Sequence, residues 1–324
     1  MRTGLIDQNG NAMVFADDLV LENQTAVDRS FSAVKSHPLL ASAMVFAAGI
    51  IWSFGAVTAR KAAVTDVWQY MLWRSIGVLV VVEFVRILRR QASSPTVRAF
   101  TSGWIMMLGN CGLMLASVAF VYAVKNTTAA NAAFLSSITP LLAAVLGRFF
   151  LKERLTLITI LAIIVAFIGL AIMLQSDSTV STSSSVIGNI AALFSSLGFA
   201  GYMVCLRTSA TRDWSPIMPG YALMTIALCT VVTLSKHRDL FPGAHDVLLA
   251  LLHGGVFIVV GTFLFNHATK TISAVGMSVL AQSETATIPL WVYLFIGERP
   301  TITTIIGGAI MLSAVLGKAM FDKP

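Results

Sequence analysis

Residues 125–156, KNTTAANAAFLSSITPLLAAVLGRFFLKERLT, recur later in the chain as residues 270–301, KTISAVGMSVLAQSETATIPLWVYLFIGERPT. The two segments align without a gap, and each runs from a polar loop through an apolar stretch to a Glu-Arg turn. The identical pairs are Lys125/Lys270, Ala129/Ala274, Leu135/Leu280, Phe150/Phe295, Glu153/Glu298, Arg154/Arg299 and Thr156/Thr301. The repeat predicts that the chain contains two structurally equivalent halves.

The composition predicts a membrane protein. Hydrophobic residues make up 56% of the chain and charged residues 11%, with a mean hydropathy of +0.82, whereas a soluble domain carries about 25% charged residues. A helix that spans a bilayer needs roughly 20 mostly apolar residues, and runs of that length are too long for strands. We predict an all-α polytopic membrane protein with ten transmembrane helices, at 39–61, 67–88, 101–123, 129–150, 156–174, 187–207, 217–235, 246–268, 274–296 and 301–320.

The number of crossings between the two copies decides how the halves are oriented. Five predicted helices separate the start of one copy from the start of the other. Because five is odd, the second half is predicted to be inverted in the bilayer. The predicted units are a five-helix repeat at 38–175, a Ser/Thr-rich linker at 176–186 and a second five-helix repeat at 187–321. Inverted repeats place a site near the midplane, where it can face either side in turn.

The loop charges predict the orientation of the chain. The net charge of +7 does not indicate a nucleic-acid partner, because most cations lie in loops on one predicted side, such as residues 86–98. Lys and Arg mark cytoplasmic loops, so both termini are predicted to be cytoplasmic and the linker, which has neither residue type, to be external. The pair Arg60-Lys61 opposes this assignment. The polar segment 1–37 is predicted to be a disordered cytoplasmic tail.

Glu284 is the most informative polar residue, because a charge at the bilayer centre costs about 2.5–3.5 kcal/mol on insertion scales. It lies beside Gln282, midway along the predicted helix at 274–296. Glu284 could carry a proton between the two sides or bind a cationic substrate. Alternatively, its carboxylate anchors neighbouring helices through hydroxyl or amide groups.

Arg74 and two histidines are further candidates. Arg74 could attract a carboxylate of the substrate, or it could reach the outer interface as a structural residue beside Trp68 and Trp73. His253 and His267 are fourteen residues apart, which puts them on one face of an α-helix. They could form a proton route, and we favour the alternative that both are interfacial.

Single amides and aromatic side chains give weaker signals. Asn110 and Asn131 could bind substrate, but such amides more often link helices. Trp52, Tyr122 and Tyr202 could form the walls of a pocket for a flat or aliphatic substrate, although Trp and Tyr in membrane proteins are mostly anchors.

Two prolines are candidate hinges. Pro140 lies in the predicted helix at 129–150 and Pro289 in the one at 274–296, and each removes a backbone hydrogen bond. Broken helices in the two halves point to a binding site. The alternative is a fixed kink without motion.

The sequence has no feature typical of cofactor or enzymatic chemistry. It has no Walker A motif, Rossmann glycine set, HExxH or nucleophile elbow. Cys111, Cys205 and Cys229 fall within predicted helices and lack the spacing of a metal or disulfide framework. We expect no cofactor, no metal and no catalytic site.

Several short motifs occur at positions consistent with ten helices. They are Trp52-Ser53-Phe54-Gly55, Arg74, Asn131-Ala132-Ala133-Phe134, Thr139-Pro140, Lys152-Glu153-Arg154, Glu284-Thr285, Ile288-Pro289, Gly297-Glu298-Arg299-Pro300 and Gly307-Gly308. With these motifs the chain resembles the EamA family of the drug/metabolite transporter superfamily, from about residue 39 to residue 320. It departs from the family in its long acidic tail and in Asn266-His267 and Lys270.

The resemblance implies two inverted five-helix repeats around a central cavity. Helices one to four and six to nine would line it, and helices five and ten would lie outside. It implies export of amino acids, metabolites or toxic compounds across a bacterial inner membrane. It also implies that Trp52, Arg74, Asn131 and Glu284 lie near the cavity.

Three functions are therefore open. The first is a secondary transporter that exports a small organic metabolite, amino acid-like or drug-like, by alternating access. The second is a flippase for a lipid or lipid-linked sugar, and the third is a non-transporting membrane scaffold whose tail binds a partner. A stripe of Ala309, Ser313 and Gly317 could mediate a homodimer, although packing on the chain's own core is the favoured interpretation.

Overall fold

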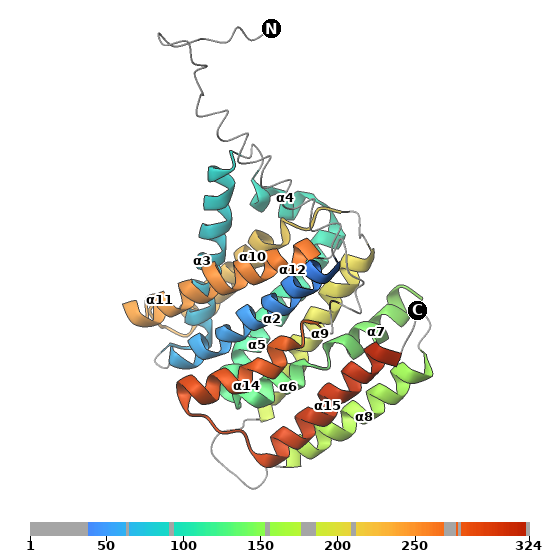
Figure 1. Cartoon of the computed structure of the whole chain (residues 1–324). Coiled ribbons are helices and arrows are strands. Elements are labelled where there is room, and N and C mark those ends of the chain that lie inside the picture. The colour runs from blue at the N-terminus through green and yellow to red at the C-terminus, as the bar shows by residue number, and fades with distance from the viewer. Residues whose placement is uncertain are drawn as a thin grey trace, which may run out of the picture.

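A computed structural model describes residues 38–62, 65–90, 94–152, 156–175, 186–208, 212–268, 277 and 280–321 (Figure 1). These residues form helices and connecting turns, with no strand among them. The elements are α2 (Pro38–Lys61), α3 (Val67–Leu88), α4 (Pro95–Thr101), α5 (Trp104–Asn126), α6 (Ala129–Ser136), α7 (Thr139–Phe150), α8 (Leu157–Gln175), α9 (Val186–Thr208), α10 (Ile217–Ser235), α11 (Ala244–Leu252), the π-helix η2 (His253–Ile258), α12 (Val259–Ala268), α14 (Ser283–Ile296) and α15 (Ile302–Phe321).

The prediction of an all-helical, multi-pass membrane protein is confirmed at this level. Helices lie in each of the ten predicted stretches. Among the residues that the structure describes, six helical segments are long and apolar enough to cross a membrane by length and composition, and they are Leu39–Lys61, Trp104–Asn126, Ala129–Phe150, Val186–Thr208, Ile217–Ser235 and Ala244–Ala268. Several predictions fall outside the described residues, namely the tail 1–37, nearly all of the linker 176–186, the Glu153-Arg154 turn and Lys270.

The fourth predicted helix is broken rather than continuous. It consists of α6 and α7, which meet at a turn at Ser137 and Ile138. The break lies directly before Pro140, which occupies the first turn of α7, where its missing N–H needs no partner. Pro289, in contrast, lies inside the single helix α14. The structure thus has a break at the first candidate hinge, whereas α14 continues through the second.

The eighth predicted helix contains a π-helix that sequence periodicity did not predict. At η2, Gly254 and Gly255 let the chain approach α3 closely. A Cβ built on Gly254 would lie 1.8 Å from the carbonyl oxygen of Arg74, so no larger residue fits without movement. π-bulges occur frequently at functional sites, and this one holds His253 against α3.

Helices of the two halves pack directly against each other. Helix α5 lies along α9, α3 along α10, and α2 beside both α12 and α14. The α5–α9 contact uses a glycine from each half, since a Cβ on Gly112 would lie 2.9 Å from the oxygen of Gly198, and the reverse distance is 2.6 Å. At this contact the backbones of the two halves therefore approach each other closely.

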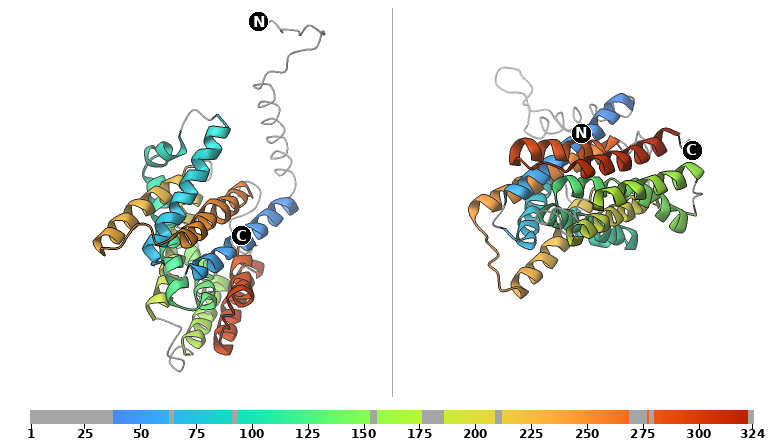
Figure 2. Two further views of the ribbon diagram at one scale, coloured as in Figure 1. Left: turned by 90° about the vertical axis from the view of Figure 1, so that its left-hand side faces the viewer. Right: turned by 90° about the horizontal axis from the view of Figure 1, so that it is seen from below.

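Helices α8 and α15 pair at the edge of the bundle (Figure 1), and Figure 2 shows them side by side from two further directions. Gly169 of α8 meets Gly307 of α15 at this contact. The predicted small-residue stripe does not face the core, because Ala309 and Ser313 are exposed. The expectation that it packs on the chain's own core is wrong, and Gly307 and Gly308 make that contact instead.

Candidate functional site

A cavity of about 170 Å³ lies between the two halves of the chain. Its wall is formed by residues of α2, α3, α5, α6, α7, α9, α10, η2, α12 and α14 and of the turn before α14, whereas α4, α8, α11 and α15 contribute no lining residue. The lining residues are Trp52, Arg74, Leu113, Ala116, Ser117, Phe120, Ala133, Ser136, Thr139, Pro140, Ser195, Phe199, Tyr202, Met203, Tyr221, His253, Ile258, Thr262, Phe265, Asn266, Ala281, Gln282, Glu284, Thr285 and Ile288.

Glu284 lies in the cavity wall, but at a different place in its helix from the one predicted. Helix α14 begins at Ser283 after a turn at residues 281 and 282, so Glu284 occupies its first turn and not its middle. A carboxylate is favoured at this position by the helix dipole. Within the part of the chain that the structure describes, the carboxylate accepts no hydrogen bond and forms no ion pair. Glu284 is therefore a half-buried acid that faces the cavity and can meet a ligand.

Arg74 and His253 form a buried polar group in the same wall. Arg74 is only 4% exposed and donates to the Ser117 hydroxyl and, at 3.3 Å, to Nε2 of His253. Nδ1 of His253 lies 2.9 Å from the Tyr70 hydroxyl. Arg74 does not extend to the outer interface, so that alternative is wrong. Arg74 therefore presents a fixed positive charge to the cavity, whereas Glu284 presents an acidic group.

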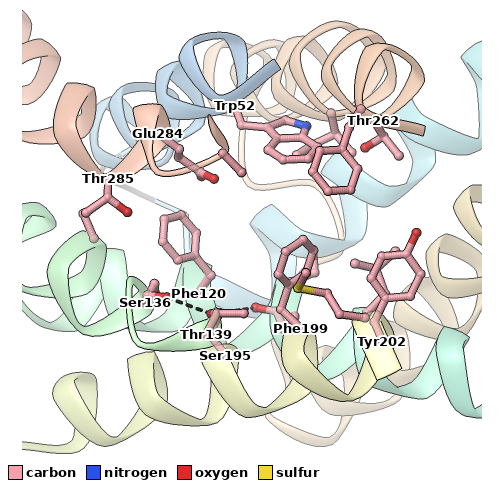
Figure 3. Close-up of a pocket in the computed structure, with 18 of the residues that line it drawn as sticks. Trp52, Phe120, Ser136, Thr139, Ser195, Phe199, Tyr202, Thr262, Glu284 and Thr285 are labelled. Carbon is pink, nitrogen blue, oxygen red and sulfur yellow. Dashed lines mark hydrogen bonds between the residues drawn. The ribbon is translucent and has the colours of Figure 1, made fainter. Parts of the chain in front are cut away.

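Aromatic rings line much of the same cavity (Figure 3). Phe120 and Phe199 project into it from α5 and α9, and Trp52 lies across from Phe199. Trp52 packs on Phe265 with 5.3 Å between ring centroids. The walls suit a flat or aliphatic group, and the cavity as a whole can hold a small organic molecule with a charged end.

The sequence-predicted residues divide into two groups. Trp52, Arg74, Tyr202, His253, Gln282, Glu284 and Pro140 line the cavity, whereas Asn110, Tyr122, Asn131, His267 and Pro289 are not among the described residues that do so.

The amides outside the cavity link elements of the bundle instead. Asn110 is fully buried against Gly220 and donates to the carbonyl of Ala99 at 3.2 Å. Asn131 accepts from the Thr304 hydroxyl at 2.9 Å. The resemblance implied that Asn131 lies near the cavity, but its contacts are those of a residue that joins α6 to α15.

His267 is turned away from His253 by the π-helix. A π-turn takes more residues than an α-turn, so the fourteen-residue spacing no longer predicts a shared face. Asn266 reaches the cavity instead, and His267 stacks on Phe263 with 6.2 Å between ring centroids. The prediction that both histidines share one face is wrong for this reason.

Several cavity residues were not predicted. Ser117, Ser136, Ser195, Thr262 and Thr285 supply hydroxyl groups to its wall. In sequence they are ordinary small polar residues of membrane helices, so only their three-dimensional convergence distinguishes them. The glycine pair after His253 was the one signal of an irregular helix.

A second cluster of polar groups lies at one end of the bundle, and we call it the Glu298 end. It consists of the side chains of Arg60, Lys125, Asp246 and Glu298 and the backbone N–H of Ala129. Glu298 pairs with Arg60 at 3.1 Å and accepts from the backbone N–H of Ala129 at 2.7 Å. Asp246 accepts from the backbone N–H of Thr65 at 3.0 Å, and Lys125 donates to the carbonyls of residues 62 and 65. The contacts of Glu298 and Asp246 join the first half to the second at one end of the bundle. The ion pair with Glu298 also explains why Arg60, a cation, lies at the end predicted to be external.

A model of the EamA-like transporter family matches residues 39–175 and again residues 186–318. The chain belongs to this family. Family membership confirms the resemblance drawn from the sequence motifs and identifies the chain as a membrane transporter by family.

Individual relatives carry transporter names. The chain is 26% identical over 299 residues to a protein of Pseudomonas aeruginosa named pseudopaline exporter CntI, covering 90% of this chain and 98% of the relative. It is 27% identical over 212 residues to an uncharacterized transporter of Clostridium kluyveri, covering 62% and 67%. A solved crystal structure aligns with a TM-score of 0.63 at 16% identity, over 87% of this chain and 99% of the other, and supports the fold.

Proposed function

We propose that the chain is a secondary transporter that exports a small organic metabolite by alternating access. The observation that carries the proposal is Glu284, an acid whose carboxylate has no hydrogen bond or ion pair in the described structure, in the wall of a cavity between the two halves. The export direction is supported by the name of the Pseudomonas aeruginosa relative, which is an exporter.

The architecture that serves this function is a pair of inverted five-helix repeats crossing the membrane ten times, with both termini cytoplasmic. The two successive matches of the family model support a division near residues 176–186. The loop charges support the orientation with both termini cytoplasmic. The proposed location is the inner membrane of a bacterium. Transport would then arise as one half rocks against the other around the cavity.

The Glu298 end is on the external side in this arrangement. The contacts of the Glu298 end hold the two halves together on this side. The cavity extends in the other direction, to Asn266 near the C-terminal end of α12 and to Gln282 directly before α14. We propose that release to the outside requires the pair of Arg60 and Glu298 to separate. The cycle would alternate between this closed arrangement and one that opens there.

The substrate is proposed to carry a positively charged group that binds at Glu284. Arg74 is already held by Ser117 and His253, so Glu284 is the charged group with the greater capacity for a new partner. His253 would couple transport to protonation through its contacts with Arg74 and Tyr70. Amines and amino acid-like metabolites have the required charge.

Comparing metabolites in the medium of cells tests this function. Cells that produce the full chain should accumulate outside at least one amine-bearing metabolite that cells lacking it retain, and Glu284→Gln should abolish the difference. If removal of residues 1–37 abolishes the cellular effect while Glu284→Gln leaves it intact, the scaffold function is favoured and the transporter proposal fails.

A further inference from the structure

Arg74 is a buried cation without a counter-charge. Its guanidinium contacts three neutral groups, which are Nε2 of His253, the hydroxyl of Ser117 and the sulfur of Met71. Within the described residues Arg74 forms no ion pair, and Glu284 in the same cavity wall forms none either. Buried charges in membrane proteins are normally paired, so one cavity with both an unpaired cation and an unpaired acid calls for an explanation.

The unpaired atoms of Arg74 and Glu284 are open to the cavity. Arg74 donates from Nε and Nη1, so the two N–H groups of Nη2 have no acceptor among the described residues. Among the described wall residues, the polar atoms that lack a partner and are fully enclosed belong to Trp52, Ser136 and Tyr202, and a ligand cannot reach them. No atom of Arg74 or Glu284 is enclosed in this way, so Nη2 and the carboxylate keep accessible surface.

His253 fixes the direction of the Arg74 guanidinium. Arginine only donates hydrogen bonds, so Nε2 of His253 is the acceptor, and we assign the proton of the neutral ring to Nδ1. Nδ1 then donates to the Tyr70 hydroxyl at 2.9 Å, and Tyr70 donates to Thr58 at 3.1 Å. Thr58 in turn donates to the carbonyl of Gly55 at 2.9 Å. The chain of hydrogen bonds from Arg74 therefore ends on the backbone of α2.

Two glycines leave room for this arrangement. A Cβ built on Gly55 would lie 2.3 Å from Nε2 of His253, and one built on Gly254 would lie 1.8 Å from the carbonyl oxygen of Arg74. The imidazole is thus held tightly between α2 and α3. With Nε bound to His253 and Nη1 bound to Ser117, Nη2 is the part of the guanidinium that remains for a ligand.

We propose that Nη2 of Arg74 binds an anionic oxygen group of the transported molecule, and that His253 is the positioning residue that directs Arg74 toward it. The substrate class is then a small zwitterion, with an amine for Glu284, a carboxylate or comparable anion for Arg74, and an apolar body between them. A guanidinium suits this role, because its hydrogen bonds to carboxylates are charge-assisted. This inference rests on the proposed function, since it adds an anion site to the amine site of the same cavity.

Two flexible amines of equal length test the anion site. The compounds 6-aminohexanoate and 6-aminohexanamide share the amine and the chain, and only the first carries a carboxylate. Neutral groups of the wall such as Thr262 and Gln282 can hydrogen-bond to either compound, so a difference in affinity reports the cation. In calorimetric titration of the purified full-length chain, 6-aminohexanoate should bind about ten- to a hundredfold more tightly, as expected for charge-assisted hydrogen bonds.

Substitution of Arg74 tests the assignment of the cation. Arg74→Gln removes the charge and should bring the ratio of the two affinities close to one, while 6-aminohexanamide binds as it does to the unaltered chain. Arg98→Gln is the matched control and should keep the ratio, because Arg98 pairs with Asp213 outside the cavity.

Substitution of His253 tests the positioning role. His253→Leu removes the acceptor for Arg74 and should lower the ratio about three- to tenfold, as expected for the loss of a hydrogen bond. His253→Gln supplies an acceptor oxygen and should restore most of the ratio. These two variants also test the anion site if Arg74→Gln fails to fold.

The outcomes separate this inference from the proposed function. Equal binding of both amines by the unaltered chain, or equal weakening of both by Arg74→Gln, would overturn the anion site and leave the proposed function intact. A ratio that His253→Leu leaves unchanged would overturn the positioning role. Glu284→Gln should weaken both amines, and if it weakens neither while the ratio stays high, the amine site fails and the anion site stands. If neither amine binds the unaltered chain, both sites fail.

Discussion

Helix α14 carries two glutamates with opposite surroundings, Glu284 in its first turn and Glu298 just beyond its last. Glu298 is engaged by Arg60 and by the N–H of Ala129. Glu284 faces the cavity without a hydrogen bond or ion pair in the described structure. The same residue type thus joins the two halves at one end of α14 and faces the cavity, where it can meet a ligand, at the other end.

The largest expected effect is on transport by Glu284→Gln. Loss of a charge-assisted contact with the substrate should lower the rate of amine counterflow in proteoliposomes about ten- to a hundredfold. Thermal unfolding in detergent should change little, because within the described residues the carboxylate has no hydrogen bond or ion pair to lose.

Glu83→Gln is the matched control for this measurement. Glu83 is bound by Arg86, Ser94 and Thr96 away from the cavity, so its loss should leave the counterflow rate within about twofold, roughly 0.4 kcal/mol. Equal rates for the unaltered chain and Glu284→Gln would remove the distinction between the two glutamates of α14.

Glu298→Gln should act on stability more than on substrate affinity. The change removes the ion pair with Arg60 and weakens the hydrogen bond to Ala129, which together should cost about 1–2 kcal/mol of unfolding free energy. Chemical denaturation monitored by tryptophan fluorescence measures it. Unchanged stability together with a complete loss of amine binding would reverse the roles assigned to the two residues.

Asn131→Ala sharpens the boundary between the binding residues and the structural ones. Asn131 accepts a hydrogen bond from Thr304 outside the cavity, so the variant should lose about 1 kcal/mol of stability and keep its affinity for the amine probe. A drop in affinity without a drop in stability would return Asn131 to the binding site.

The smallest effect is expected at the surface pair of Arg98 and Asp213. Burial raises the pKa of Asp213, but hydrogen bonds from Ser215 and Arg98 outweigh it, and the net pKa lies below the ordinary value of 3.8. A lowered folded-state pKa stabilises the chain above the unfolded value, and the contribution is lost as pH falls through the folded value.

Because the Asp213 side chain is 55% exposed, solvent screening limits the contribution to below about 1 kcal/mol. Unfolding temperatures measured at pH 7 and at pH 3 should therefore differ slightly less for Asp213→Asn than for the unaltered chain. A difference between the two proteins that grows as pH rises above neutrality would contradict this assignment.

The sequence predicted the helices well because their signal is local. Apolar stretches of membrane-spanning length appear directly in the composition, and Glu284, Arg74 and His253 stood out because charged and polar residues are rare there. The π-helix at His253 and the start of α14 at Ser283 depend on packing between distant helices, which a fixed helical period does not contain. That is why His267 was placed on the wrong face and Glu284 in mid-helix.

The positions of single amides and hydroxyls could not be predicted for a related reason. Asn131 and Ser136 lie in the same helix α6, yet only Ser136 lines the cavity. Which of them reaches the cavity depends on the turn at residues 137 and 138 and on the contact with α15. Neither feature has a distinct sequence pattern.

The opposed orientation of the two halves is tested most directly by labelling one position after each of two equivalent helices with a membrane-impermeant maleimide. Lys152 and Arg299 are exposed residues that follow the equivalent helices α7 and α14, and each can be changed to Cys after Cys111, Cys205 and Cys229 are replaced. In intact cells, the reagent should label Arg299→Cys and leave Lys152→Cys unlabelled, with the reverse in inside-out vesicles. Labelling of both positions from the same side would contradict the inverted arrangement.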